Sequence, residues 1–170
     1  MNIKVKQLTL LATAGFLLAA CGQGKKEETT VATTTQETTA APKTVYSLED
    51  AQKAVFETVS VSGKDTVTLY YKDDVLLKQE VVTKFIVSKM EEKNPLELLK
   101  KTAQKTQEKM KDFIGKGIEI KTDYKDDVFT FAYSFDYTKL DMQKLKELIP
   151  DLNPRDDNTI SYSNYKDSLV

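Results

Sequence analysis

Apolar and polar residues alternate in two parts of the chain, and each part has the layout of a β-hairpin. In the first, the alternation runs over residues 66–71 and resumes over residues 75–87, on either side of Lys72-Asp73-Asp74. Such alternation indicates half-buried strands, and aspartate tolerates the left-handed backbone that a tight hairpin turn requires. We therefore predict a hairpin here, preceded by a further strand around residues 55–61.

The second part repeats this layout closer to the C-terminus. Predicted strands around residues 118–120 and 128–137 flank the turn Lys125-Asp126-Asp127. The five residues at 71–75, Tyr-Lys-Asp-Asp-Val, return unchanged at 124–128. Because the residues around the two copies agree poorly, we favour independent use of one turn chemistry over an ancient duplication.

A segment with helical periodicity lies between the two hairpins. Asn94-Pro95 is typical of a helix start, and Gly115 and Gly117 end the run. The other face carries mostly lysine, glutamate and glutamine, so the helix is amphipathic and about five turns long. Its apolar positions are Leu96, Leu99, Ala103, Met110, Phe113 and Ile114.

These elements together predict an α+β fold for a single domain at residues 45–170. The sheet is antiparallel, has about five strands from two hairpins, and packs against the long amphipathic helix. A short helix follows toward the C-terminus, around residues 142–149, and Pro150 ends it. The length of this segment is that of one ordinary domain.

Residues 1–20 have the layout of a secretory signal peptide. Lys4 and Lys6 precede an uncharged apolar run that is shorter than the ~20 residues of a transmembrane helix. The run ends in Leu18-Ala19-Ala20-Cys21-Gly22, which resembles the lipobox of bacterial lipoproteins and contains the chain's only cysteine. This resemblance implies cleavage before Cys21 and lipidation of its thiol. The alternative is an ordinary signal peptide followed by a free thiol.

Residues 21–44 are rich in threonine and have almost no large apolar side chains, so we predict a disordered tether. Two acyl chains, at about 0.8 kcal/mol per buried methylene, anchor a protein stably. The expected partner is therefore the membrane, through the lipid on Cys21, with the domain on the outer face of the cell membrane. Scarce arginine favours a Gram-positive host; in a Gram-negative cell the domain would be periplasmic.

In the order of its elements the chain resembles the YehR-like family of bacterial lipoproteins. The resemblance is carried by residues 67–79 (Val-Thr-Leu-Tyr-Tyr-Lys-Asp-Asp-Val-Leu-Leu-Lys-Gln), the helix from Asn94, and the hairpin ending in Phe135-Asp136-Tyr137. It implies a small α+β domain with an antiparallel sheet, and it implies no established function. Family members usually continue beyond the position of Ser163 into a longer final helix, and the sequence leaves open whether this chain is truncated after Val170.

The sequence excludes several chemistries. It has no histidine, so Ser-His-Asp and Cys-His nucleophiles and the usual zinc sites are excluded. Without residues 1–20, which contain two lysines and no acid, 23 basic and 26 acidic side chains remain. Arg155 is the only arginine, and no basic cluster is interleaved with aromatic residues, which excludes a nucleic-acid partner. We expect no cofactor, no metal and no catalytic residue.

Two weaker motifs are better explained by structure. Ser163-Asn164-Tyr165-Lys166 has the Ser-x-x-Lys spacing of penicillin-binding proteins but lacks their companion motifs. The acidic loop from Asp151 departs from an EF-hand at Arg155, at Asp156 in place of glycine, and at Tyr162 in place of glutamate. We therefore predict that the paired aspartates serve turns and helix caps.

The strand at 128–137 is unusually aromatic. One face carries Phe129, Phe131, Tyr133, Phe135 and Tyr137, whereas the other is the more polar. Two interpretations remain open: the whole row lies in the core beneath the helix, or its end stays open as a platform for a ligand or a partner chain. The candidate ligand-binding residues are Tyr133, Phe135 and Tyr137.

Three functions follow as hypotheses. The first is a non-catalytic binder of a small solute or peptide, which requires an apolar pocket or groove. The second is a structural or interaction protein that binds another envelope protein through a flat patch or an unpaired sheet edge. The third is an enzyme that uses carboxylates alone, which requires two acids facing each other in a cleft.

Overall fold

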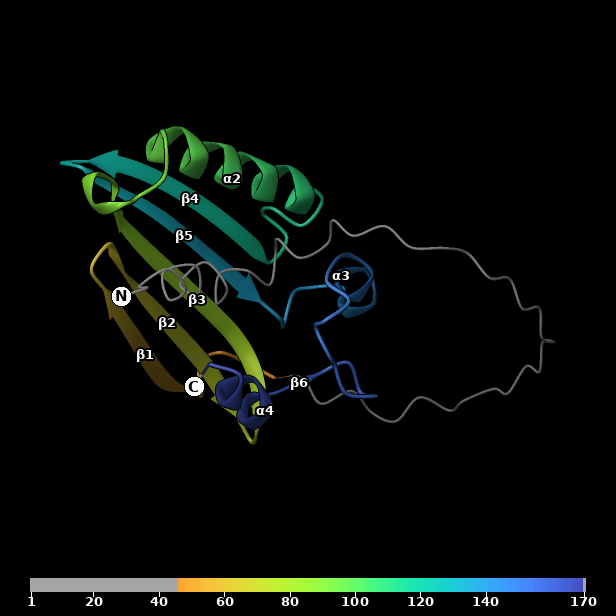
Figure 1. Cartoon of the computed structure of the whole chain (residues 1–170). Coiled ribbons are helices and arrows are strands. Elements are labelled where there is room, and N and C mark those ends of the chain that lie inside the picture. The colour runs from red at the N-terminus through yellow and green to blue at the C-terminus, as the bar shows by residue number, and fades with distance from the viewer. Residues whose placement is uncertain (1–45, 170) are drawn as a thin grey trace, which may run out of the picture.

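The computed structural model describes residues 46–169. The predicted signal peptide (1–20) and tether (21–44), with Cys21, lie outside the described residues. The described part contains an antiparallel sheet in the order β1-β2-β3-β5-β4, and a two-residue strand, β6, pairs with the start of β3 (Figure 1). The strands are β1 (Gln52–Ser60), β2 (Gly63–Lys72), β3 (Val75–Ile86), β4 (Ile118–Lys125), β5 (Val128–Asp136) and β6 (Ile160–Ser161).

Both predicted hairpin turns are present. Asp73 and Asp74 have φ angles of 49° and 61°, and Asp126 and Asp127 have φ angles of 50° and 64°. A two-residue turn with positive φ at both central residues has a twist that matches the twist of antiparallel strands. The prediction from the repeated Lys-Asp-Asp sequence is confirmed.

The helices of residues 46–169 lie on one face of the sheet (Figure 1). This inner face carries Phe129, Phe131, Tyr133 and Phe135 of β5, while the opposite, outer face carries mainly polar side chains, such as the ion pair of Lys78 and Glu80. The α+β prediction with one long packed helix and a short C-terminal helix is confirmed. The helices are α2 (Pro95–Met110), α3 (Met142–Leu148), α4 (Tyr162–Asp167) and a 3₁₀ turn at Val87–Lys89.

The long helix α2 begins at Pro95 after the N-cap residue Asn94, as predicted, but it ends earlier than predicted. Asn94 has a left-handed backbone, with φ of 62°, and its side chain caps nothing; its carbonyl oxygen instead accepts the N–H of Leu98 at 3.2 Å. The helix ends at Met110, so Phe113 and Ile114 lie in the following turn. Phe113 still packs against the core, which explains why the apolar spacing continued past the helix end.

A register shift in the first hairpin and a glycine before β4 affect how the sheet packs against the segments on its inner face. A register shift between Tyr70 and Tyr71 brings Leu76 opposite Tyr71, and Leu76 joins the inner core. Gly117 has a φ of 119°, and a Cβ there would lie 2.8 Å from Leu140 Cγ, so glycine is required before β4. In residues 46–169 no helix combines the length and apolar character needed to span a membrane.

Candidate functional site

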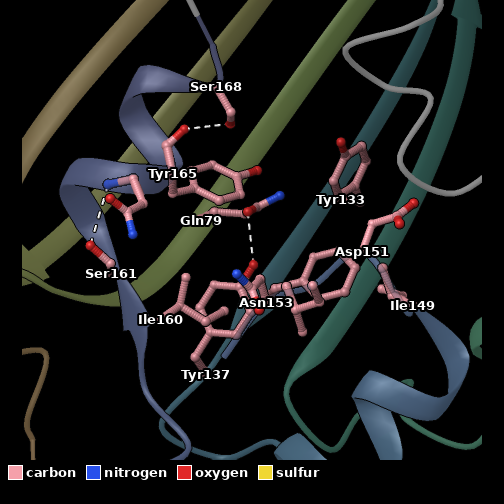
Figure 2. A pocket seen from close by; sticks show the side chains of 13 residues that line it. Gln79, Tyr133, Tyr137, Ile149, Asp151, Asn153, Ile160, Ser161, Tyr165 and Ser168 are labelled. Atoms are coloured by element: carbon pink, nitrogen blue, oxygen red, sulfur yellow. Dashed lines mark hydrogen bonds between the residues drawn. The ribbon is translucent and has the colours of Figure 1, made fainter. Parts of the chain in front are cut away.

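The candidate residues Tyr133, Phe135 and Tyr137 line one pocket on the inner face (Figure 2). Its volume is about 250 Å³. Tyr133 and Phe135 of β5, Tyr137 directly after it and Gln79 of β3 form the sheet side, and residues between Ile149 and Ser168, including part of α4, form the opposite wall. The other lining residues are Ile149, Asp151, Leu152, Asn153, Ile160, Ser161, Asn164, Tyr165 and Ser168.

Aromatic packing and one buried hydrogen bond fix the sheet side of the pocket. The ring centroids of Tyr133 and Phe135 are 5.8 Å apart and nearly perpendicular, and those of Phe135 and Tyr137 are 6.1 Å apart. The hydroxyl of Tyr137 donates to Oε1 of Gln79 at 2.8 Å. The sequence analysis did not identify Gln79 as a site residue. It could have been found as an amide side chain among the mainly apolar inward positions of β3.

Tyr165 of α4 reaches over the pocket toward Tyr133 (Figure 2). Burial raises the pKa of Tyr165 to about 12 and raises the pKa of both Tyr133 and Tyr137 well above the usual range. All three hydroxyls are therefore protonated and uncharged at neutral pH. The pocket presents neutral hydrogen-bonding groups on aromatic rings.

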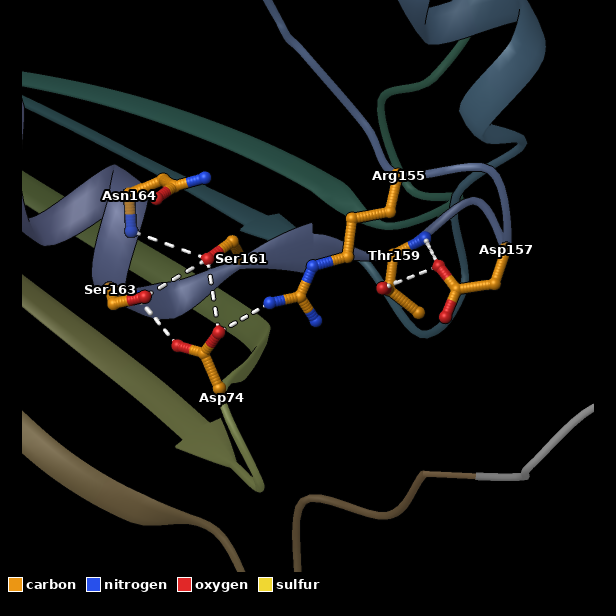
Figure 3. Close-up of polar contacts among 7 residues, drawn as sticks. All are labelled: Asp74, Arg155, Asp157, Thr159, Ser161, Ser163 and Asn164. Atoms are coloured by element: carbon orange, nitrogen blue, oxygen red, sulfur yellow. Dashed lines mark hydrogen bonds and ion pairs between the residues drawn. The ribbon is translucent and has the colours of Figure 1, made fainter.

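We call the pocket side formed by residues between Ile149 and Ser168 the C-terminal wall. The carboxylate of Asp74 attaches this wall to the sheet. Asp74, in the turn between β2 and β3, accepts the N–H of Ser163 at 2.8 Å and the hydroxyl of Ser161 at 3.1 Å, and it pairs with Arg155 (Figure 3). The N–H of Ser163 is the main cause that lowers the pKa of Asp74 to about 2, and the hydroxyls and Arg155 add to it.

The backbone and an aromatic stack reinforce this attachment. The N–H of Tyr162 donates to the carbonyl oxygen of Asp74 at 2.9 Å. The ring of Tyr162 stacks on Tyr71 with centroids 3.5 Å apart and planes within 4°. We call Asp74, Arg155, Ser161 and Ser163 the Asp74 hub.

Residues of the weaker motifs take part in local contacts. Ser163 belongs to the Asp74 hub, and Lys166 forms an ion pair with Asp167 at 3.8 Å. In the acidic loop, Asp157 accepts the N–H and the hydroxyl of Thr159, at 2.9 and 2.6 Å. Within residues 46–169, no group of three or more histidine, cysteine, aspartate or glutamate side chains is placed to hold a metal ion.

The geometry defines a class: a small α+β domain whose antiparallel sheet has one covered face and a pocket at one end of that face. Residues 46–169 match the family described as "Protein of unknown function (DUF1307)", and the chain belongs to this family. The resemblance to the YehR-like family that the sequence indicated is confirmed.

Two solved structures are similar to the chain. The NMR structure of the E. coli YehR protein is 23% identical, with 71% of this chain and 86% of that chain covered and a TM-score of 0.48. The NMR structure of a protein from Streptococcus pneumoniae TIGR4 is 18% identical, with 75% and 81% covered and a TM-score of 0.36. Among curated proteins, none matches the chain.

Proposed function

We propose that this chain is a lipid-anchored cell-envelope protein that binds a small solute in the pocket of Tyr133, Phe135 and Tyr137, without catalysis. The observation that carries the proposal is the pocket itself, because it combines apolar rings with a few inward polar groups, as ligand sites do. At about 250 Å³ the pocket is slightly smaller than most small-molecule sites, which measure roughly 300–1,000 Å³. This size favours a compact solute over a peptide.

The non-catalytic part of the proposal rests on the acids around the pocket. Asp151 is the single carboxylate in its wall. Hydrolysis by carboxylates alone uses two acids on opposite sides of the scissile bond. The carboxylate-only enzyme is therefore the weakest of the three hypotheses.

The test of the anchor and of the bound solute uses one preparation. The intact mass of protein extracted from membranes is expected to show a diacylated Cys21 as the first residue, and Cys21→Ala is expected to lack the lipid. Native mass spectrometry of the same sample is expected to detect a small molecule that dissociates on activation. A chain without lipid would refute the anchor, and an empty domain in every preparation would refute the solute-binding role.

A specific observation favours the interaction protein as the second candidate. β1 is an edge strand, and Val55, Val59 and Val61 are exposed along it and its turn, Val59 by 74%. The other edge, β4, carries Glu119, Lys121, Asp123 and Lys125, and such charges block edge-to-edge pairing. In-cell crosslinking from position 59 that captures one envelope protein reproducibly, and is lost when Val55→Lys is added on the same strand, would favour this candidate.

A further inference from the structure

The pocket wall contains one charged side chain, the carboxylate of Asp151. Its other lining residues are aromatic, aliphatic or neutral polar, and neither lysine nor arginine is among them. An anionic solute would therefore lose its hydration without gaining a cationic partner, which is costly. A cation would instead find a carboxylate and aromatic rings in the wall.

The rings of the wall suit a cation. Tyr133 on the sheet and Tyr165 on α4 border the same space (Figure 2), and Phe135 also lines it. The face of an aromatic ring carries partial negative charge and attracts ammonium groups, most strongly where water is displaced. Since the tyrosine hydroxyls stay uncharged at neutral pH, these rings act as neutral faces with polar ends.

A second, independent observation lies on the same face of the sheet. Asp65 of β2 is 6% exposed, and neither of its carboxyl oxygens has a hydrogen-bond partner. Its cross-strand neighbour Thr83 is also buried, and the Thr83 hydroxyl likewise has no hydrogen-bond partner among the described residues. A buried carboxylate without a partner costs free energy unless a positive charge compensates it.

Asp65 acts electrostatically on the pocket. Burial is the main cause of the raised pKa of Tyr133, followed by the nearby Tyr165 and then by Asp65. Burial raises the pKa of Asp65 as well. Asp65 lies on the same inner face as Tyr133, and an ionised carboxyl there attracts a cation placed against that ring.

We infer that the solute is an organic ammonium ion, held against the faces of Tyr133 and Tyr165 by the charges of Asp151 and Asp65. This inference rests on the proposed solute-binding function and specifies its chemistry. The positive centre lies among the rings, and the amide and hydroxyl groups of the wall accept or donate hydrogen bonds to the rest of the molecule. Affinity therefore depends on charge as well as on shape.

The test compares two probes of the same shape. Choline carries a quaternary ammonium group, and 3,3-dimethyl-1-butanol has carbon in place of its nitrogen. Calorimetric titration of the full-length protein at low salt is expected to show at least about tenfold tighter binding of choline. Asp151→Asn and Asp65→Asn are each expected to weaken choline binding several-fold and to leave the neutral probe unchanged. Asp123→Asn, on the exposed part of β4, is the control for a lost surface charge.

Ring substitutions locate the cation. Tyr165→Phe keeps an aromatic face and is expected to retain choline binding, whereas Tyr165→Leu is expected to lose it. Circular dichroism of each variant verifies that the domain is folded. Equal affinities for the two probes would overturn the ammonium inference while leaving a solute pocket. Binding of neither probe up to ~10 mM would also overturn it, and the solute recovered by native mass spectrometry would then decide the proposed function separately.

Discussion

The two ends of the inner face use the same aromatic row of β5 in different ways. At one end, Phe129 and Phe85 are buried beneath Leu99 and Ala103 of α2. At the other end, Phe135 and its neighbours are covered by short elements and a loop, and a pocket remains. A long amphipathic helix presents a continuous apolar stripe and closes the surface. Short helices joined by a polar loop leave space, so the cover decides whether an aromatic row becomes core or a binding wall.

The two covers are also attached differently. The helix α2 is held by buried apolar side chains, whose contribution is insensitive to pH. The C-terminal wall also buries apolar side chains such as Ile149 and Ile160, but in addition it is tied to the sheet by the Asp74 hub, which depends on one ionised carboxylate. The two ends should therefore respond differently to substitution and to acid.

The largest effect is expected at the α2 end. Leu99 is 5% exposed, so Leu99→Ala should lower the free energy of unfolding by about 2–5 kcal/mol, through lost burial and the cavity that remains. Its neighbour Leu98 is 43% exposed, and Leu98→Ala should cost much less. Urea denaturation followed by circular dichroism measures both. Equal losses in the two variants would show that α2 does not pack as described.

A smaller effect is expected at the pocket end. Asp74→Asn keeps a residue that tolerates the left-handed turn but removes the charge that three groups contact. Because the side chain is partly exposed, the cost should be about 1 kcal/mol. Hydrogen exchange should quicken in α4 and leave α2 unchanged. Asp73→Asn is the matched control in the same turn; if it loosened α4 equally, the hub would not be the attachment.

The smallest effect is a dependence on pH. The pKa of Asp74 falls from 3.8 to about 2 in the folded protein, so the stability it contributes is fully present above pH 4. That contribution is lost as pH falls from about 4 toward 2. The pKa values of Asp136 and Asp157 are also lowered, so the informative quantity is the difference between wild type and Asp74→Asn. Exchange rates in α4 should differ at pH 5 and converge near pH 2; a constant difference would contradict this.

Local signals made much of the fold predictable from sequence. The pairs Asp73-Asp74 and Asp126-Asp127 predicted both hairpin turns, because the left-handed backbone tolerates few residue types. Alternation placed Tyr133 and Phe135 on one face. Asn94-Pro95 predicted the start of α2 correctly, although Asn94 has a left-handed backbone and its side chain makes no capping hydrogen bond. The two residues of β6 are too few to show a period.

The pocket was only partly predictable because its walls are far apart in the chain. The hydrogen bond between Tyr137 and Gln79 joins residues 58 positions apart. Tyr165 and Asp151 come from segments whose sequence shows only short or irregular elements. The role of Asp74 in holding the C-terminal segment was not predictable for the same reason. The sequence around Asp74 indicated a turn, whereas its partners Arg155 and Ser163 come close to it only in the folded protein.

The central claim is that a small solute occupies the pocket between β5 and α4. Native mass spectrometry of the full chain extracted from membranes, with one variant that fills the pocket, tests it most directly. Asn164→Trp places a large side chain at a lining position of α4, and Asp167→Trp places it on the same helix outside the lining. The account predicts a bound small molecule in wild type and Asp167→Trp and none in Asn164→Trp. Retention of that molecule by Asn164→Trp would contradict the account.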